Sequence, residues 1–186
     1  MYFIGLVPPE DIRDRVRALK LEMQRRFGAG HALKSPAHIT LQMPFRLSGE
    51  KIEVLEMSLR EFSALQTRFH LHLVDFDCFA PRVIFIGVKN SKPLIGLEGD
   101  LKKALSGKGI LPAGEGDLPF HPHMTIATRD LNEAAFHKAW PEFEQRSFRM
   151  EFEAKSLFLL RHNGSLWELY REFEFGVRVS EGLPGS

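Results

Sequence analysis

The 186-residue chain has one cysteine, Cys78, and no apolar run long enough to cross a membrane. A single cysteine excludes an intrachain disulfide framework and a cysteine metal cluster, and it favours a reducing compartment. The first residues lack a basic leader and a signal-length apolar segment. We therefore expect a cytoplasmic protein with no membrane partner.

The chain also lacks an excess of either charge, because 25 Lys and Arg face 24 Asp and Glu for a net charge of +1. This balance argues against binding a long double-stranded nucleic acid through bulk charge, although a small or terminal phosphate remains a reasonable ligand. With 44% hydrophobic residues, the chain can bury the core of an ordinary globular protein.

Two short stretches repeat one pattern: His38-Ile39-Thr40-Leu41 and His123-Met124-Thr125-Ile126. With eight His and four Thr, chance predicts about 0.2 His-x-Thr pairs, so two pairs are unexpected. In a strand, His and Thr would share one face while the apolar residues point into the core. Two imidazoles and two hydroxyls on such faces suit the chemistry of a phosphate group.

The hydrophobic periodicity predicts the same element order twice. We expect strands at 2–7, at the first His-x-Thr motif up to Pro44, at 69–76, at 83–88, at the second motif, at 148–160 and at 166–175. Helices are expected from Glu10 to Gly28, over 52–65, over 94–105 after Pro93, and after an Asp130/Glu133 capping box, with Pro141 ending or kinking the last one. A glycine-rich loop spans 107–119, and Asn163-Gly164 predicts a hairpin turn.

Both motifs therefore occupy the second strand of a strand-helix-strand-helix-strand unit. His38 lies 35 residues after Phe3, and His123 lies 39 after Ile84. We predict an α+β fold in which duplicated units, about 1–80 and 81–178, have a pseudo-twofold relation and face a central cleft between two antiparallel sheets. A lone His would more often be a hydrogen-bonded strand residue than a catalytic one, but the repetition favours the catalytic interpretation.

The doubled motif resembles that of the 2H phosphoesterases, and within them the bacterial 2′-5′ RNA ligase and RNA 2′,3′-cyclic phosphodiesterase branch. That family has two His-x-[Thr/Ser] motifs about 80 to 90 residues apart, and here the separation is 85. The opening strand followed by Pro-Pro is also similar. The resemblance implies a single bilobal domain over residues 1–180, and we expect the terminal residues 181–186 to form a flexible tail.

The resemblance also implies that His38 and His123 act as an acid and base pair across a phosphate. The strand faces and the duplicated halves predict that the two imidazoles lie about 5 to 8 Å apart. Thr40 and Thr125 would donate hydrogen bonds to the non-bridging oxygens. This mechanism requires no metal and no other cofactor. The near symmetry of the cleft leaves the roles of the two histidines open, and family analogy favours His123 as base and His38 as acid.

Other residues are weaker candidates for substrate contacts. Phe45 and Phe120 flank the motifs and could stack on a base, although core packing is the commoner role of a phenylalanine. Lys34 could help to hold phosphate. Arg129 follows the second motif one place later than the basic residue of many relatives, so a solvated charge is an equally good interpretation.

Three classes of function remain open at this point. The first is a metal-independent phosphoesterase, monomeric, that hydrolyses or reversibly ligates RNA ends with 2′,3′-cyclic phosphates or 2′-5′ linkages, or a small cyclic nucleotide. The second is a non-catalytic RNA- or nucleotide-binding module on the same scaffold. The third is a metal-dependent hydrolase that uses His121 and His123, which offer only two close nitrogens.

Overall fold

The computed structural model describes residues 1–111 and 119–176, and its strands form two four-stranded antiparallel sheets. The first sheet has the order β2-β1-β7-β8, with β1 (Tyr2–Leu6), β2 (Ile39–Phe45), β7 (Ser156–His162) and β8 (Trp167–Glu174). The second has the order β5-β4-β3-β6, with β3 (Phe69–Phe79), β4 (Val83–Val88), β5 (His123–Ala127) and β6 (Arg149–Ala154). The predicted α+β class with two antiparallel sheets is confirmed.

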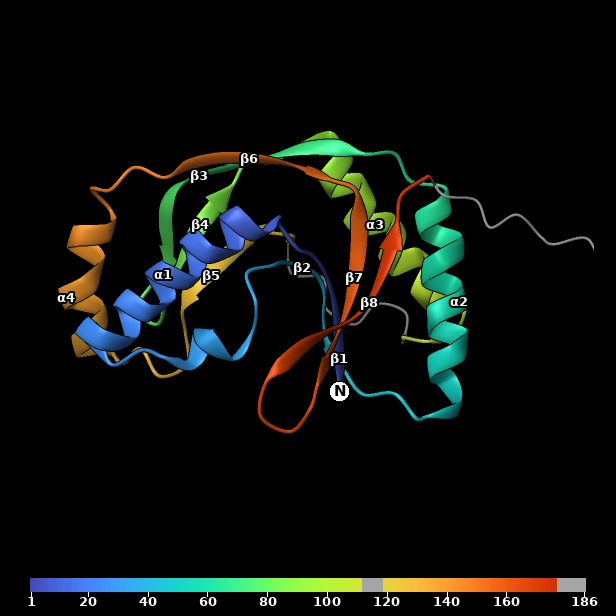
Figure 1. Cartoon of the computed structure of the whole chain (residues 1–186), viewed down its shortest axis with the longest axis horizontal. Helices are drawn as coiled ribbons and strands as arrows, with labels where there is room; N and C mark the ends of the chain where they lie inside the picture. The colour runs from blue at the N-terminus through green and yellow to red at the C-terminus, as the bar shows by residue number, and fades with distance from the viewer. Residues whose placement is uncertain (112–118, 177–186) are drawn as a thin grey trace, which may run out of the picture.

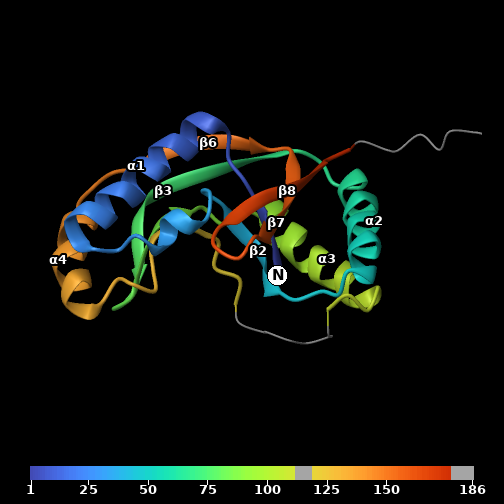
Figure 2. The same ribbon diagram turned by 60° about the horizontal axis from the view of Figure 1, so that its bottom comes forward.

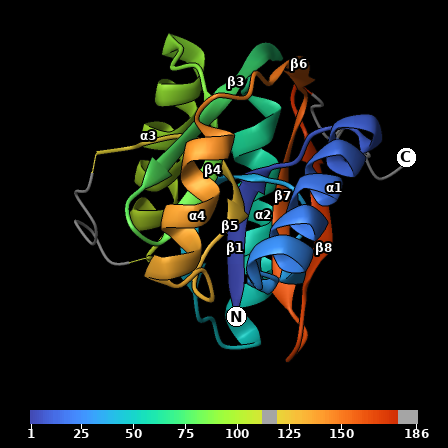
Figure 3. The same ribbon diagram turned by 90° about the vertical axis from the view of Figure 1, so that its left-hand side faces the viewer.

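Each sheet is covered by two helices, and the two groups form the lobes seen at the right and left of Figure 1. Helices α2 (Glu50–Ala64) and α3 (Lys92–Gly107) pack on the first sheet, through β8, β7 and β2. Helix α1 (Glu10–Phe27) packs on β5 of the second sheet and beside α4 (Glu133–Phe143), as Figure 3 also shows. A short 3-10 helix, η1 (His31–Lys34), links α1 to β2.

The element order repeats as predicted, with β1-α1-β2-α2-β3 followed by β4-α3-β5-α4-β6. The lobes, however, do not coincide with the two sequence halves. Helix α1 leaves the first sheet to cover the second, whereas α3 leaves the second sheet to cover the first. The chain therefore crosses between the lobes repeatedly, and Figure 2 shows β3 and β6 running along the length of the molecule.

The prediction of a single strand over 148–160 is wrong. It is two strands in different sheets, because β6 pairs with β3 and β7 pairs with β1. The change of sheet occurs at Lys155, between the buried residues Ala154 and Ser156. The sequence does not reveal this break, because strand-like residues continue on both sides of Lys155 without a Gly or Pro and both strands carry buried side chains. The hairpin at Asn163-Gly164 is confirmed, with Gly164 at φ 107°.

Two predicted helix boundaries also differ from the structure. The cap of α4 is Asn132, whose side chain accepts a hydrogen bond from the Ala135 N–H at 2.9 Å, rather than Asp130. Asp130 instead accepts from the backbone N–H groups of Gly30 and His31, which joins the second lobe to η1. Helix α4 continues through Pro141 to Phe143, so of the two effects predicted for this proline, a kink or an end, the end is wrong. Helix α1 ends as predicted at Gly28, with φ 74°.

Two expectations fall partly or wholly on parts of the chain outside the described residues: the glycine-rich loop 107–119, of which 112–118 are not described, and the tail 181–186. Within the described residues, none of the helices combines the length and apolar character that a membrane span needs.

Candidate active site

The first His-x-Thr motif opens β2 at the centre of the molecule. Ile39 and Leu41 are buried in the core, whereas His38 and Thr40 are half-buried on the opposite face. This is the arrangement that strand alternation predicts. Strand β2 is held by β1, where Thr40 lies opposite Gly5.

The second motif repeats this arrangement in β5. Met124 and Ile126 are fully buried, and His123 and Thr125 are half-buried on the other face. His123 lies opposite Gly87 of β4, the strand that corresponds to β1 in the repeat. Strands β2 and β5 contact each other, so the two motifs meet where the lobes join.

Both imidazole rings are oriented by the same hydrogen bond. Nδ1 of His38 lies 2.8 Å from the carbonyl oxygen of Pro36, and Nδ1 of His123 lies 2.7 Å from that of His121. A carbonyl oxygen can only accept, so Nδ1 carries the proton in each ring. The neutral ring then has its unprotonated nitrogen, Nε2, available to take a proton.

A phenylalanine ring packs on each imidazole. The ring centroids of Phe3 and His38 are 4.6 Å apart, and those of Phe85 and His123 are 4.8 Å apart. Each phenylalanine is followed two residues later by the glycine opposite the motif, so both strands contain Phe-Ile-Gly. Phe3 and Phe85 were not among the predicted site residues, although the identical tripeptides are a usable sequence signal for them.

The two glycines are required by close backbone contacts. A β-carbon at Gly5 would lie 2.6 Å from the carbonyl oxygen of Ile39, within the first motif. At Gly87 it would lie 2.7 Å from the carbonyl oxygen of Val74. Any side chain there would push the neighbouring strand away, so Gly5 lets β1 lie close to β2 and Gly87 lets β4 lie close to β3.

The two histidines differ in what surrounds the carbonyl oxygen that each Nδ1 contacts. Lys20 of α1 is buried, and its Nζ donates to the carbonyl oxygens of Ser35 at 2.9 Å and Pro36 at 3.4 Å. The Pro36 oxygen therefore accepts from both Lys20 and His38. Among the described residues no carboxylate lies within salt-bridge distance of Lys20. Burial lowers the pKa of Lys20 to about 8, so it remains largely charged at neutral pH.

The pKa of His38 is lowered to about 4, chiefly because burial penalises the charged ring. The hydrogen bond to Pro36 opposes this shift, while the charges of Lys20 and His123 add to it. Burial also lowers the pKa of His123, although no lysine is among the causes. In the free protein both rings are therefore predominantly neutral at pH 7.

Comparison with known proteins agrees with this geometry. Residues 8–166 match the family model of the 2′-5′ RNA ligase superfamily. The chain belongs to the 2′-5′ RNA ligase superfamily. It is 33% identical over 172 residues to the RNA 2′,3′-cyclic phosphodiesterase of Bacillus subtilis strain 168, covering 88% of this chain and 90% of that one.

Two solved structures share the fold. Escherichia coli LigT, crystallised with 3′-AMP, has a TM-score of 0.69 at 20% identity and covers 94% of this chain and 97% of its own. The Thermus thermophilus protein TT0787 has a TM-score of 0.66 at 18% identity, with the same coverage. As a member of the 2′-5′ RNA ligase superfamily, the protein is a 2H phosphoesterase, and the predicted family and fold are confirmed.

The four other predicted substrate contacts, Phe45, Phe120, Arg129 and Lys34, differ in where they lie relative to the two His-x-Thr motifs. Phe45 packs against Tyr2 and the core, and Phe120 also packs against the core. The aromatic neighbours of the histidines are instead Phe3 and Phe85. The ring centroids of Phe79 and His123 are 5.2 Å apart, and those of Trp167 and Phe3 are 4.7 Å apart.

Arg129 is exposed beyond the end of β5, where its charge acts on His31. Lys34 lines a cavity next to the first motif.

The metal-site hypothesis receives no third ligand in the described part of the chain. No three His, Cys, Asp or Glu side chains there group as metal ligands would. Nδ1 of His123 is engaged by the His121 carbonyl oxygen.

Proposed function

We propose that this protein hydrolyses 2′,3′-cyclic phosphates at RNA ends, or in small cyclic nucleotides, with His38 and His123 as its acid and base pair. The carrying observation is the matched orientation of the two histidines, each with Nδ1 bound to a backbone carbonyl and Nε2 available. A binding module would need no such pair of proton carriers. The name of the Bacillus relative and the 3′-AMP bound by LigT support a nucleotide substrate.

In the proposed reaction, water attacks the phosphorus and passes its proton to Nε2 of one neutral histidine. The other histidine, protonated beside the bound phosphate, donates a proton to the departing ribose oxygen. Thr40 and Thr125 donate hydrogen bonds to the non-bridging oxygens as the transition state forms. The same sequence of proton transfers, with a 5′-hydroxyl attacking in place of water and the ribose 3′ oxygen departing, would form a 2′-5′ linkage from a cyclic phosphate.

The first test is hydrolysis of 2′,3′-cyclic AMP, followed by chromatography with and without EDTA. We expect turnover to a phosphomonoester that is unchanged by EDTA, because the acid and base are both side chains. Loss of turnover in EDTA that returns with added metal would favour the metal-dependent alternative. Binding of the nucleotide without any turnover would favour the non-catalytic module.

The charge of Lys20 favours one assignment of the base and acid roles to His38 and His123. Its charge opposes protonation of His38, and His123 has no corresponding lysine. We therefore propose His38 as the base, which reverses the assignment made from family analogy. In the bell-shaped pH profile of kcat/KM, the acidic limb would then follow the pKa of His38.

Lys20→Met should raise the pKa of His38, because it removes a nearby positive charge while keeping an apolar side chain of similar length. The acidic limb of the profile should move to higher pH by up to about one unit, with the basic limb unchanged. NMR titration of the His38 ring in both proteins measures the same shift directly. A folded variant with an unshifted His38 pKa would contradict this role, and movement of the basic limb alone would return the base role to His123.

A further inference from the structure

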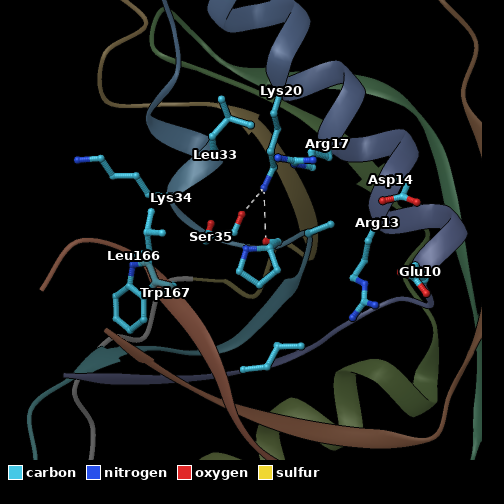
Figure 4. Close-up of a pocket in the computed structure, with 13 residues that line it drawn as sticks. Glu10, Arg13, Asp14, Arg17, Lys20, Leu33, Lys34, Ser35, Leu166 and Trp167 are labelled. Carbon is cyan, nitrogen blue, oxygen red and sulfur yellow. Dashed lines mark hydrogen bonds between the residues drawn. The ribbon is translucent and has the colours of Figure 1, made fainter. Parts of the chain in front are cut away.

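A cavity of about 380 Å³ lies beside the first motif, between α1, η1 and the start of β8. This volume is within the range of about 300 to 1,000 Å³ typical of small-ligand sites. Figure 4 shows Arg13, Arg17 and Lys20 extending from α1 towards the cavity, with Lys34 and Trp167 on the side opposite Glu10 and Asp14. The lining thus includes four cationic side chains and two carboxylates.

The cavity adjoins the proposed active site. Its wall includes Pro36 and Ala37, the two residues before His38. Another part of its wall is Trp167, whose indole packs edge-on against Phe3 at 4.7 Å, and Phe3 packs on His38. The cavity therefore adjoins the first motif through Pro36 and Ala37, and Trp167 is linked to His38 through the buried ring of Phe3.

The lining fits a nucleotide. Arg13 and Arg17 are one helical turn apart on the same face of α1 and form no ion pair with the described carboxylates. Arginine pairs well with the planar, bidentate geometry of phosphate oxygens. Trp167 provides an aromatic surface for a base, and stacking of a base on such a ring tolerates any sequence.

We propose that this cavity binds the nucleotide on the 5′ side of the cyclic phosphate, so that the preferred substrate is a single-stranded RNA chain rather than a mononucleotide. The inference depends on the proposed function for the position of the terminal phosphate. Arg13 and Arg17 would bind the phosphodiester that joins the last two nucleotides, and Trp167 would contact the base.

The test compares 2′,3′-cyclic AMP with a short single-stranded RNA that ends in a 2′,3′-cyclic phosphate. We expect the wild-type protein to have a KM at least about tenfold lower for the RNA, because each added phosphate contact and stacked base contributes to binding. Arg13→Ala/Arg17→Ala should remove this preference while leaving kcat/KM for cyclic AMP within about twofold. Arg15→Ala/Arg25→Ala is the control, because it removes two positive charges of α1 outside the cavity.

Binding can be measured without turnover. The chain has two tryptophans, so Trp140→Phe leaves Trp167 as the only one. Its fluorescence should change when the RNA binds, and the change should require more RNA in the Arg13/Arg17 variant, with a shallower salt dependence.

The outcomes separate the two proposals. Equal KM values for RNA and cyclic AMP, or equal losses on both substrates in the Arg13/Arg17 variant, would overturn the cavity proposal and leave the proposed function standing. Absence of turnover on both substrates would overturn the proposed function, whereas the fluorescence titration would still decide whether the cavity binds RNA. An unchanged Trp167 signal at saturating RNA would contradict the placement of a base there.

Discussion

Replacing His38 or His123 with alanine is expected to lower kcat for 2′,3′-cyclic phosphate hydrolysis by about 10² to 10⁴ fold. Each substitution removes one of the two proton transfers, because each ring supplies one Nε2 from a fixed orientation. The double substitution should cost less than the product of the single losses, since the two rings act on one transition state. Steady-state kinetics with 2′,3′-cyclic AMP measures all three variants.

The matched control is His70→Ala, which removes an exposed histidine from β3. It should retain wild-type turnover. Circular dichroism and thermal unfolding show whether the active-site variants are folded, because each histidine also packs on a phenylalanine. Near-native turnover in either folded single variant would contradict the acid and base proposal.

The strand faces were predictable because alternation depends only on local chain geometry. His38 and Thr40 share a face opposite Ile39 and Leu41, and the second motif follows the same rule. The helix stop at Gly28 and the turn at Asn163-Gly164 were predictable for a similar reason, because each position needs a backbone conformation that few residues adopt.

The lobes were less predictable because they depend on long-range pairing. The periodicity of α1 shows that one face is buried but not which sheet buries it, and in the structure that sheet contains β5 rather than β1. Similarly, the strand-like residues on both sides of Lys155 do not indicate that β6 and β7 pair in different sheets.

The two His-x-Thr motifs were predicted from the sequence, but the residues that pack around the histidines were not. Phe3 and Phe85 could have been found from the repeated Phe-Ile-Gly. Lys20 could not have been found in this way. The sequence shows only that a lysine lies on the same helix face as Val16 and Met23. A buried lysine is rare, and its contact with Pro36 depends on how α1 crosses the segment before β2. Phe45 was chosen from its adjacency to the first motif, and its ring packs against Tyr2.

Replacing Thr40 or Thr125 with alanine is expected to lower kcat for cyclic phosphate hydrolysis by about 10 to 10³ fold, less than the loss of either histidine. Each substitution removes one hydrogen bond to a non-bridging oxygen and leaves both proton transfers in place. The loss should fall mainly on kcat rather than on KM, since the charge on these oxygens is greatest in the transition state.

Serine at either position tests whether the hydroxyl is the group that matters. Thr40→Ser and Thr125→Ser keep the donor and should restore most of the activity lost in the alanine variants. Thr67→Ala, at an exposed position before β3, is the control and should be unaffected. If the serine variants were as impaired as the alanine variants, the threonine methyl groups and strand packing would be responsible. The two hydroxyls would then have no role in holding the phosphate, and the symmetry of the motifs would reflect the fold rather than the chemistry.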